Sequence, residues 1–377
     1  MQFVAVVFWV SAGLIVYAHL GYPLALRTLI ALRRKPTLAH PATLDELPRV
    51  SLIVAAYDEE EVIAAKVANA LALDYPRERL QILVASDGSS DATVERAREA
   101  GADFVLNLPR GGKIAAQNAA AEEASGEILA FSDANSEWKP DALRHLIEPF
   151  ADPAIGYACG QVRFLSAGGD NLEGAYWRYE MKLREMESAL AGVTAGNGAI
   201  YAVRASAYIA LDPSGSHDLS FPFALAKRKL RSLYVPWAAA EEKMVPTMEG
   251  EFARKRRMMV GIWDIVVGEG MLRPRGYSPF YAFELASHRL LRYLTPFLHL
   301  LAFVANVALL GDGWVYTVTF ELQLLVVVAA LLGRWSSFAP LRIARYYAMT
   351  TGSIAAGLWD RARNGPPSSW EKAEGTR

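Results

Sequence analysis

The sequence has few of the residues and motifs on which several common protein classes depend. Its 377 residues include one cysteine, Cys159, in an apolar stretch, so a disulfide framework is excluded and we interpret this thiol as a core residue. It has no histidine pair at metal-binding spacing and no Gly-x-Ser-x-Gly segment, which argues against a zinc enzyme or a serine hydrolase. Neither sign of charge is in excess, because 39 basic and 40 acidic residues leave a net charge of −1, and we expect no nucleic-acid partner.

Charged residues are also absent from residues 3–20, a length of apolar chain that suits a membrane span. We interpret residues 1–32 as an N-terminal transmembrane helix rather than a secretory signal peptide, because no Lys or Arg precedes the long apolar stretch. Residues 293–310 and 314–332 are two further apolar stretches, which predict a transmembrane hairpin over residues 293–333. Glu321 lies inside this hairpin, and we expect its carboxyl group to face protein rather than lipid.

Basic residues follow the first span and flank the hairpin, which predicts a multi-pass protein of the inner cell membrane with its soluble domain in the cytoplasm. A proline-containing linker over residues 33–48 would lead to a domain over residues 49–265, followed by an amphipathic interface segment over residues 266–292. Within residues 337–360, only about fourteen apolar or small residues follow Arg345 without interruption, which is short for a span, so we favour an interfacial helix there over a further transmembrane helix. The tail over residues 361–377 is basic.

Three short apolar runs of the soluble domain, over residues 51–56, 80–86 and 127–132, are each followed by acidic residues. Such runs are typical of strands buried on both faces of a parallel sheet, and the helical stretches between them fit βαβ crossovers. Because ligands bind outside the carboxyl ends of these strands, we predict an α/β domain whose rim can hold a metal and a nucleotide. We also expect helices over residues 58–72, 91–100, 113–124 and 170–190, and strands over residues 102–107, 199–203 and 233–237.

Two residues at this predicted rim have both a structural and a functional interpretation. Asp87 is not needed to cap the next helix, because Ser90 or Asp91 could do so, and we favour a contact with the base or ribose of a nucleotide. Lys113 enters a helix after two glycines, where the helix dipole disfavours a cation unless an anion such as a diphosphate lies nearby. A solvated lysine after a flexible turn is the alternative.

Three other features also leave alternatives open. Asp133 and Asn135 offer oxygen ligands for one hard divalent ion, or they form an Asx-turn that closes the strand. By pattern alone, Asp218 and His217 in the polar loop after residue 213 are more often ordinary loop residues than catalytic groups. The basic run over residues 254–257 fits a membrane-facing patch and a diphosphate clamp about equally well.

Six segments follow one another along the soluble domain. They are Val-Ala-Ala-Tyr-Asp-Glu-Glu at 54–60, Ala-Ser-Asp-Gly-Ser-Ser-Asp-Ala-Thr at 85–93, Gly-Lys-Ile-Ala-Ala-Gln-Asn at 112–118, Asp-Ala-Asn at 133–135, Thr-Ala-Gly-Asn-Gly-Ala-Ile-Tyr-Ala-Val-Arg at 194–204 and His-Asp at 217–218. In order and spacing they resemble the motifs of a membrane-bound, inverting family 2 glycosyltransferase over roughly residues 49–265. The resemblance implies a GT-A catalytic domain, which is Rossmann-like with a mostly parallel sheet.

The resemblance also implies roles for individual residues. The nucleoside would contact Ala55, Tyr57, Glu59 and Asp87, and the donor phosphate or sugar would contact Lys113. Asp133 and Asn135 would hold Mg²⁺ or Mn²⁺ on the diphosphate, and Asp218 would deprotonate the acceptor hydroxyl. Further donor or acceptor contacts would come from Gly196, Asn197, Gly198, Arg254 and Arg257. The implied partners are a nucleotide-sugar donor, with a UDP-sugar favoured, and a lipid-linked or glycan acceptor.

Two departures from the family's pattern keep other functions open. Asn135 replaces the second metal aspartate, which supports the alternative of a sugar-nucleotide-binding membrane protein without turnover. The Gln-x-x-Arg-Trp motif of processive synthases is missing, and residues 251–257 near its place contain no tryptophan, which weakens the alternative of a processive polysaccharide synthase. A nicotinamide-dependent dehydrogenase is disfavoured, because no Gly-x-Gly-x-x-Gly follows the first predicted strand. We therefore expect single transfer of a sugar, with inversion, to a lipid-linked or polysaccharide acceptor.

Overall fold

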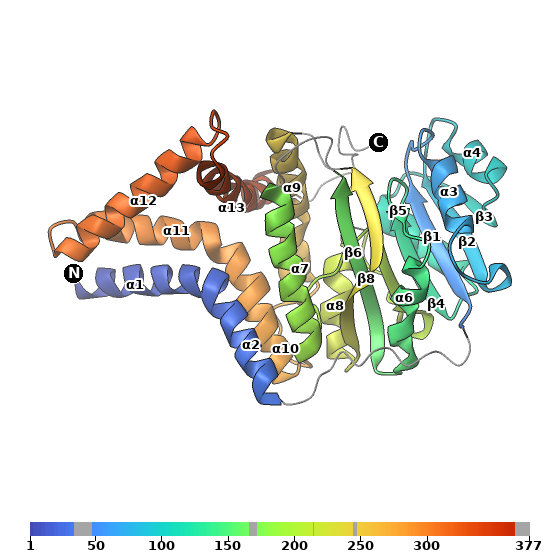
Figure 1. The fold of residues 1–377 in the computed structure, drawn as a ribbon, viewed down its shortest axis with the longest axis horizontal. Helices are drawn as coiled ribbons and strands as arrows, with labels where there is room; N and C mark the ends of the chain where they lie inside the picture. Colours follow the sequence, from blue (N-terminus) through green and yellow to red (C-terminus); the bar gives the residue numbers. More distant parts are fainter. Residues whose placement is uncertain (34–46, 166–171, 214, 244–246, 366–377) are drawn as a thin grey trace.

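The computed structural model describes residues 1–33, 47–165, 172–213, 215–243 and 247–365. Three long helices project from one side of an α/β domain, and other helices lie at the junction between the two parts (Figure 1). Most of the predicted linker and most of the basic tail fall outside the described residues.

The α/β domain is built on one eight-stranded sheet of order β3-β2-β1-β4-β7-β6-β8-β5. Its strands are β1 (Val50–Ala56), β2 (Leu80–Asp87), β3 (Phe104–Leu108), β4 (Ile128–Asp133), β5 (Glu137–Trp138), β6 (Ile155–Leu165), β7 (Ile200–Arg204) and β8 (Arg231–Lys243). The first four strands in this order are parallel, and β7 is antiparallel to both of its neighbours. The three apolar runs of the sequence are therefore adjacent strands, and the predicted rim is confirmed by the pairing of Ala55 with both Ala85 and Asp133.

Helices cover both faces of this sheet. They are α3 (Ile63–Leu71), α4 (Thr93–Glu99), α5 (Lys113–Glu122), α6 (Ala142–Ile147), α7 (Leu172–Leu190) and α8 (His217–Lys227). Helix α9 (Met248–Trp263) lies at the junction with the long helices (Figure 1). One apolar cluster joins β1, β2 and α6, and a second joins β4, β7, α5 and α8. Cys159 is fully buried in the second cluster, which confirms its interpretation as a core thiol.

Two local predictions were wrong. The helix expected from residue 58 begins at Ile63, because Asp58 has a left-handed backbone (φ 47°) and its carboxylate accepts a 2.7 Å hydrogen bond from Ser90 N. His217 and Asp218, expected in a loop, form the first turn of α8. The helix starts there because the preceding Ser216 has an extended backbone, as residues before a helix do.

Three helices are long and apolar enough to cross a membrane, among the residues that the structure describes: Gln2–Arg33, Pro279–Ala308 and Trp314–Leu332. The first joins α1 (Gln2–Val16) and α2 (Tyr22–Arg33), the second joins α10 (Pro279–Glu284) and α11 (Leu291–Ala308), and the third is α12. The second helix begins well before the predicted residue 293, so it includes part of the predicted interface segment. Glu321 is exposed on α12, which contradicts our expectation that it faces protein within this chain.

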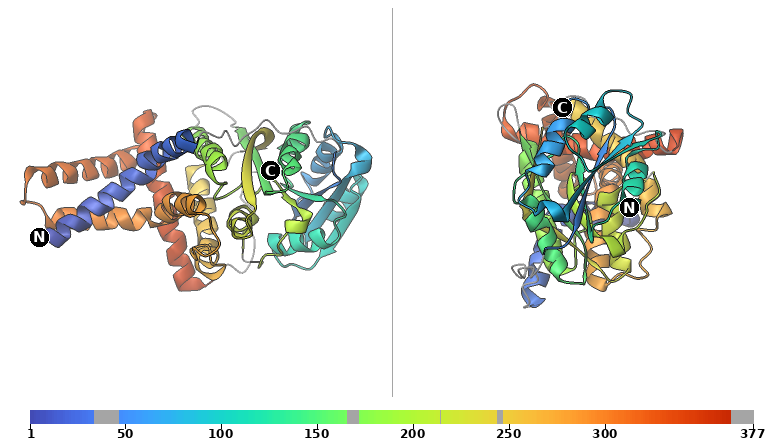
Figure 2. Two further views of the ribbon diagram at one scale, coloured as in Figure 1. Left: turned by 90° about the horizontal axis from the view of Figure 1, so that it is seen from below. Right: turned by 90° about the vertical axis from the view of Figure 1, so that its right-hand side faces the viewer.

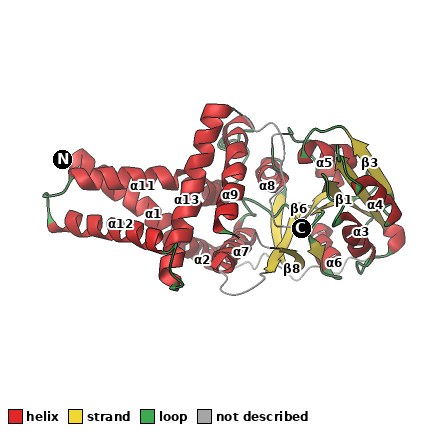
Figure 3. Cartoon of the chain, turned by 90° about the horizontal axis from the view of Figure 1, so that it is seen from above, coloured by secondary structure: helices red, strands yellow, loops and turns green. Residues whose placement is uncertain are grey.

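Helix α13 (Ala339–Asn364) is not one of these candidate spans. It runs across the ends of α11 and α12 instead of alongside them (Figures 2 and 3). It packs closely on α9, because a Cβ on Gly357 would lie 2.5 Å from Met259 Cβ. Ion pairs from Arg256 to Asp360 and from Arg361 to Asp264 hold the same interface. An interfacial location for α13 stays a prediction.

Candidate active site

Asp87 lies at the carboxyl end of β2 and is 1% exposed. Its carboxylate accepts hydrogen bonds from Gly111 N at 2.7 Å and Gly112 N at 2.9 Å, and it forms an ion pair with Arg110 at 2.9 Å. Gly112 has a φ of 95°, which favours glycine at this turn. Asp87 therefore fixes the turn that leads into α5, a structural role that the sequence interpretation did not include.

Tyr57 and Arg110 form one surface beside this turn. The Arg110 guanidinium carbon lies 3.3 Å from the centroid of the Tyr57 ring, within the range of a cation–π contact. The sequence does not predict this contact, because only the position of Arg110 before Gly-Gly-Lys distinguishes it from other surface arginines. Ala55 and Glu59 are each 2% exposed, so they lie beneath the rim, where Glu59 N donates a 2.7 Å hydrogen bond to Thr93 Oγ1.

Lys113 is the first residue of α5, and its ammonium forms an ion pair with the Asp133 carboxylate at the end of β4. Desolvation opposes the charge of Lys113, yet Asp133 outweighs it and raises the pKa of Lys113 above its ordinary value. Asp133 keeps 29% of its side chain exposed, so it remains accessible to a ligand. Its carboxylate and the amide oxygen of Asn135 are a donor set that fits a hard divalent ion such as Mg²⁺ or Mn²⁺.

A buried lysine supports the loop that carries this donor set. Lys66 on α3 is 3% exposed, and its Nζ donates a 2.7 Å hydrogen bond to the backbone oxygen of Ser136. Burial lowers the pKa of Lys66 to about 7, although the carboxylates of Asp133 and Glu242 oppose this shift. No pattern in the sequence indicates this role, because a lysine in an amphipathic helix is usually solvated.

The loop over residues 196–198 lies between α7 and β7 and meets both Lys113 and Asp218. Gly196 N donates a 2.6 Å hydrogen bond to the backbone oxygen of Asp218. A Cβ on Gly196 would lie 1.8 Å from Tyr157 Oη, and a Cβ on Gly198 would lie 3.9 Å from Lys113 Nζ. The structure therefore brings together predicted donor and acceptor residues that are about 100 positions apart in the sequence.

Asn197 is 4% exposed, and its side chain is fully engaged. Its amide oxygen accepts a hydrogen bond from Arg184 on α7, and its amide nitrogen donates to the backbone oxygen of Gly160. Asn197 thus holds the shape of the loop, and direct contact with a substrate stays a prediction.

Asp218 occupies the first turn of α8, where a negative charge is stabilised by the helix dipole. The hydroxyl of Ser216 donates a hydrogen bond to Asp218 Oδ1. Asp218 is also one of the carboxylates whose charge raises the pKa of Lys113. The candidate base therefore lies within electrostatic reach of the candidate donor-binding lysine.

The acceptor-side loop also touches the apolar helices. Tyr281 Oη on α10 donates a 3.3 Å hydrogen bond to the backbone oxygen of Val193, and Arg289 Nε donates a 2.9 Å hydrogen bond to Thr194 Oγ1. Glu187 on α7 accepts a 2.7 Å hydrogen bond from the Tyr22 hydroxyl on α2. The loop before residue 196 is thus held directly by the candidate membrane helices.

Arg254 and Arg257 lie on α9. Arg254 forms a two-pronged ion pair with Glu251 on the same helix, at 2.7 and 2.8 Å. Its guanidinium group is therefore already engaged by a carboxylate, and a contact of either arginine with the donor or acceptor stays a prediction.

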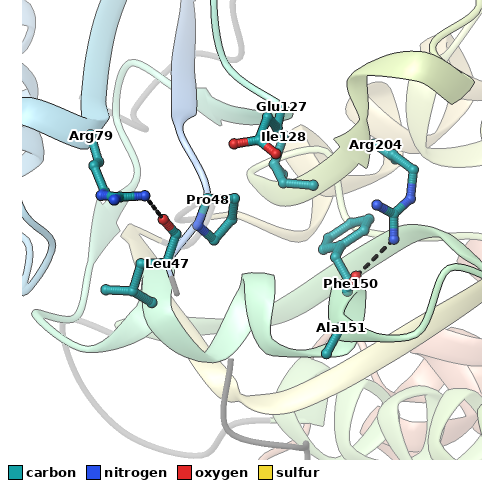
Figure 4. Close-up of a pocket in the computed structure, with 8 residues that line it drawn as sticks. All are labelled: Leu47, Pro48, Arg79, Glu127, Ile128, Phe150, Ala151 and Arg204. Atoms are coloured by element: carbon teal, nitrogen blue, oxygen red, sulfur yellow. Dashed lines mark hydrogen bonds between the residues drawn. The ribbon is translucent and has the colours of Figure 1, made fainter. Parts of the chain in front are cut away.

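A separate pocket of about 310 Å³ opens at the opposite edge of the sheet, where β1 and β4 begin (Figure 4). Its arginines bond backbone oxygens, Arg79 with Leu47 at 2.5 Å and Arg204 with Phe150 at 2.8 Å. Because ligands of open α/β sheets bind at the carboxyl edge, we do not assign the active site to this pocket.

The model of the family named "Glycosyl transferase family 2" matches residues 51–230, which include each of the candidate residues except Arg254 and Arg257. The chain belongs to glycosyltransferase family 2. The predicted family and enzyme class are therefore confirmed.

Two relatives of the chain are named for different products, a glycolipid and a polysaccharide. The chain is 30% identical over 295 residues to a beta-monoglucosyldiacylglycerol synthase of Trichormus variabilis, across 70% of this chain and 60% of that protein. It is 33% identical over 138 residues to a poly-beta-1,6-N-acetyl-D-glucosamine synthase of Staphylococcus aureus, across 35% of this chain and 32% of that protein. The chain thus spans at most about 60% of the length of these relatives.

A solved structure matches nearly the whole chain. The mannosyltransferase PcManGT from Pyrobaculum calidifontis, in complex with GDP-Man and Mn²⁺, superposes with a TM-score of 0.74 and 22% identity, across 94% of this chain and 99% of that one. The predicted GT-A fold with apolar helices at both ends is confirmed.

Proposed function

We propose that this glycosyltransferase moves a hexose from a nucleotide-sugar donor to a lipid-linked or glycan acceptor, at the cytoplasmic face of the membrane and with inversion. The observation that carries the proposal is the convergence of Asp133, Lys113, Gly198 and Asp218 at the carboxyl edge of the sheet. These residues supply an acid–base group and a cation beside an oxygen donor set, which is what displacement of a nucleoside diphosphate requires.

In the proposed reaction, Asp218 takes the proton of the acceptor hydroxyl while its oxygen attacks the anomeric carbon, and the nucleoside diphosphate leaves. Lys113 binds a donor phosphate oxygen, for which its place at the N-terminus of α5 is suited. A divalent cation held by Asp133 and Asn135 would neutralise charge on the leaving diphosphate. Attack and departure on opposite sides of one carbon account for the proposed inversion.

A lipid-linked acceptor is supported by the contacts of the acceptor-side loop. Val193 and Thr194, just before Gly196, are hydrogen-bonded by Tyr281 and Arg289 of the candidate membrane helices. An acceptor at the membrane surface would therefore approach Asp218 from this side. A curated relative is named for diacylglycerol glucosylation, which agrees with an acceptor of this kind.

A screen of nucleotide-sugar donors identifies the base of the donor. The sequence favours a UDP-sugar, and the solved neighbour holds GDP-Man, so UDP-glucose, UDP-N-acetylglucosamine and GDP-mannose are each offered with Mn²⁺ to protein purified in detergent. Diacylglycerol, a polyprenyl phosphate and an oligosaccharide serve as acceptors, and products are identified by mass spectrometry. Mn²⁺-dependent addition of one sugar supports the proposal. A polymer on one acceptor would favour a processive synthase, and no product with any pair would contradict the proposal.

A further inference from the structure

A buried tyrosine lies beneath the candidate active site and touches three of its elements. Tyr201 on β7 is fully buried, and its ring stacks on Phe131 of β4 with centroids 4.8 Å apart and planes 4° apart. Phe131 and Asp133 are alternate residues of β4 and lie on the same face of the sheet. The ring of Tyr201 therefore packs on the strand that presents the candidate metal ligand.

The hydroxyl of Tyr201 connects two helices. It accepts a 3.2 Å hydrogen bond from Gln117 Nε2 on α5, and it lies 2.6 Å from His217 Nδ1 on α8. Gln117 is four residues after Lys113 and lies on the same face of α5. His217 is the residue before Asp218. One hydroxyl thus joins the helix of the donor-binding lysine to the helix of the candidate base.

The hydrogen bonds of the Tyr201 hydroxyl bear on the tautomer of His217. With the Tyr201 hydroxyl accepting from Gln117 and donating to His217 Nδ1, a neutral His217 carries its proton on Nε2, which is buried and has no hydrogen-bond partner among the described residues. His217 is 3% exposed, with the rings of Phe131 and Phe221 packed edge-on at 5.3 and 4.7 Å. Burial, followed by the charge of Lys113, lowers the pKa of His217 to about 3, so this ring is neutral at physiological pH.

We propose that Tyr201 and His217 are positioning residues of the transferase, whose hydrogen bond holds Asp218 in register with Lys113 and Asp133. This inference rests on the proposed function, because it takes Asp218 as the base and Lys113 as a donor-binding group. The pair touches neither substrate: Tyr201 acts through Phe131 and Gln117, and His217 acts through the first turn of α8.

The test compares two tyrosines that differ in this connection. Tyr201→Phe removes the hydroxyl between Gln117 and His217 and keeps the stacked ring. Tyr208→Phe is the matched control, because the Tyr208 hydroxyl also bonds α5, through Asn118 Oδ1 at 2.7 Å, and is not bonded to His217. Misplacement of a catalytic group by about 1 Å costs on the order of 100-fold in rate.

We expect Tyr201→Phe to lower kcat by roughly 10- to 100-fold, with the KM for the donor within about twofold of wild type. Because the base is displaced from the acceptor hydroxyl, the fraction of donor lost to hydrolysis should rise. Tyr208→Phe should leave both quantities unchanged. A purely structural role would lower transfer and hydrolysis together, which would overturn the inference.

Two substitutions of His217 test whether an acceptor for the Tyr201 proton is sufficient to preserve activity. His217→Asn places an amide oxygen that can accept the Tyr201 proton, whereas His217→Leu has no acceptor. We expect the asparagine variant to keep several-fold more transfer activity than the leucine variant at equal thermal stability. Equal activity in the two variants would contradict a role for the hydrogen bond.

The hydrogen bond between Tyr201 and His217 can also be tested without measuring enzyme activity. In ¹⁵N-histidine-labelled protein, NMR should show His217 with its proton on Nε2 and no second proton down to pH 5. A proton on Nδ1, or protonation near pH 6, would overturn the inference whatever the kinetics. Absence of donor turnover in the wild type would instead overturn the proposed function, and the catalytic role of the pair would fail with it.

Discussion

Replacement of Gly196 by alanine should displace the candidate base. An added Cβ would lie 1.8 Å from Tyr157 Oη, whereas ordinary contacts begin near 3.4 Å, so the loop or the ring must move by about 1.6 Å. The Tyr157 ring is fully buried and stacked between Tyr201 and Phe221, so most of this movement falls on the loop. Gly196 N is bonded to the backbone oxygen of Asp218 at 2.6 Å, and that bond moves with the loop.

Overpacking of this kind costs about 1–3 kcal/mol, and each kcal/mol lowers the melting temperature of a domain of 150–250 residues by roughly 2–4 °C. We therefore expect Gly196→Ala to melt several degrees below wild type and to lose about 100-fold in kcat. Melting in detergent and Mn²⁺-dependent donor turnover measure the two effects. Gly198→Ala is the stability control, because its nearest atom, Lys113 Nζ, lies 3.9 Å away. Equal loss of melting temperature in the two variants would refute the reasoning, as would full activity of Gly196→Ala.

Three further predictions concern the metal ligand, the buried histidine and the helix interface. Asp133→Ala should weaken Mn²⁺-dependent binding of a nucleoside diphosphate at least about tenfold, as measured by calorimetry, and unchanged binding would exclude Asp133 as a ligand. The pKa of His217 falls from 6.5 to about 3 on folding, so the unfolded chain binds the extra proton and the unfolding free energy decreases as the pH falls through this window, by up to about 1.4 kcal/mol per unit. His217→Asn should flatten that loss in melting curves between pH 7 and 4, and an equally steep curve would contradict the assignment. Gly357→Leu should separate α13 from α9, because the added Cβ would lie 2.5 Å from Met259 Cβ, and unchanged proteolysis of α13 would show that the helices do not pack as described.

Much of the fold was predictable because its signals are local. The runs that form β1, β2 and β4 are mostly apolar, and helical segments of suitable length separate them, which predicted a parallel sheet with a site at its carboxyl edge. The three apolar helices were equally clear from composition. The second begins earlier than predicted, at Pro279, and its first turns pack against α7.

The parts that sequence reasoning missed depend on contacts between distant residues. The hydrogen bond between Gln117 and Tyr201 spans 84 residues, and the one between Lys66 and Ser136 spans 70. No local pattern shows that a histidine before the candidate base will be buried, or that Arg110 will lie on Tyr57. The sequence identified which residues could carry the chemistry, and the tertiary structure was needed to show what positions them.

Donor turnover and donor binding measured together in Asp218→Asn test the central claim most directly. The substitution keeps size and removes the proton acceptor, so the variant should bind the Mn²⁺ complex of the donor nucleotide as wild type does and lose transfer by at least about 100-fold. Loss of both donor binding and transfer would show that Asp218 supports the fold or binds the donor instead of acting as the base. Transfer at the wild-type rate would contradict the account, because Asp218 could then not be the base that activates the acceptor.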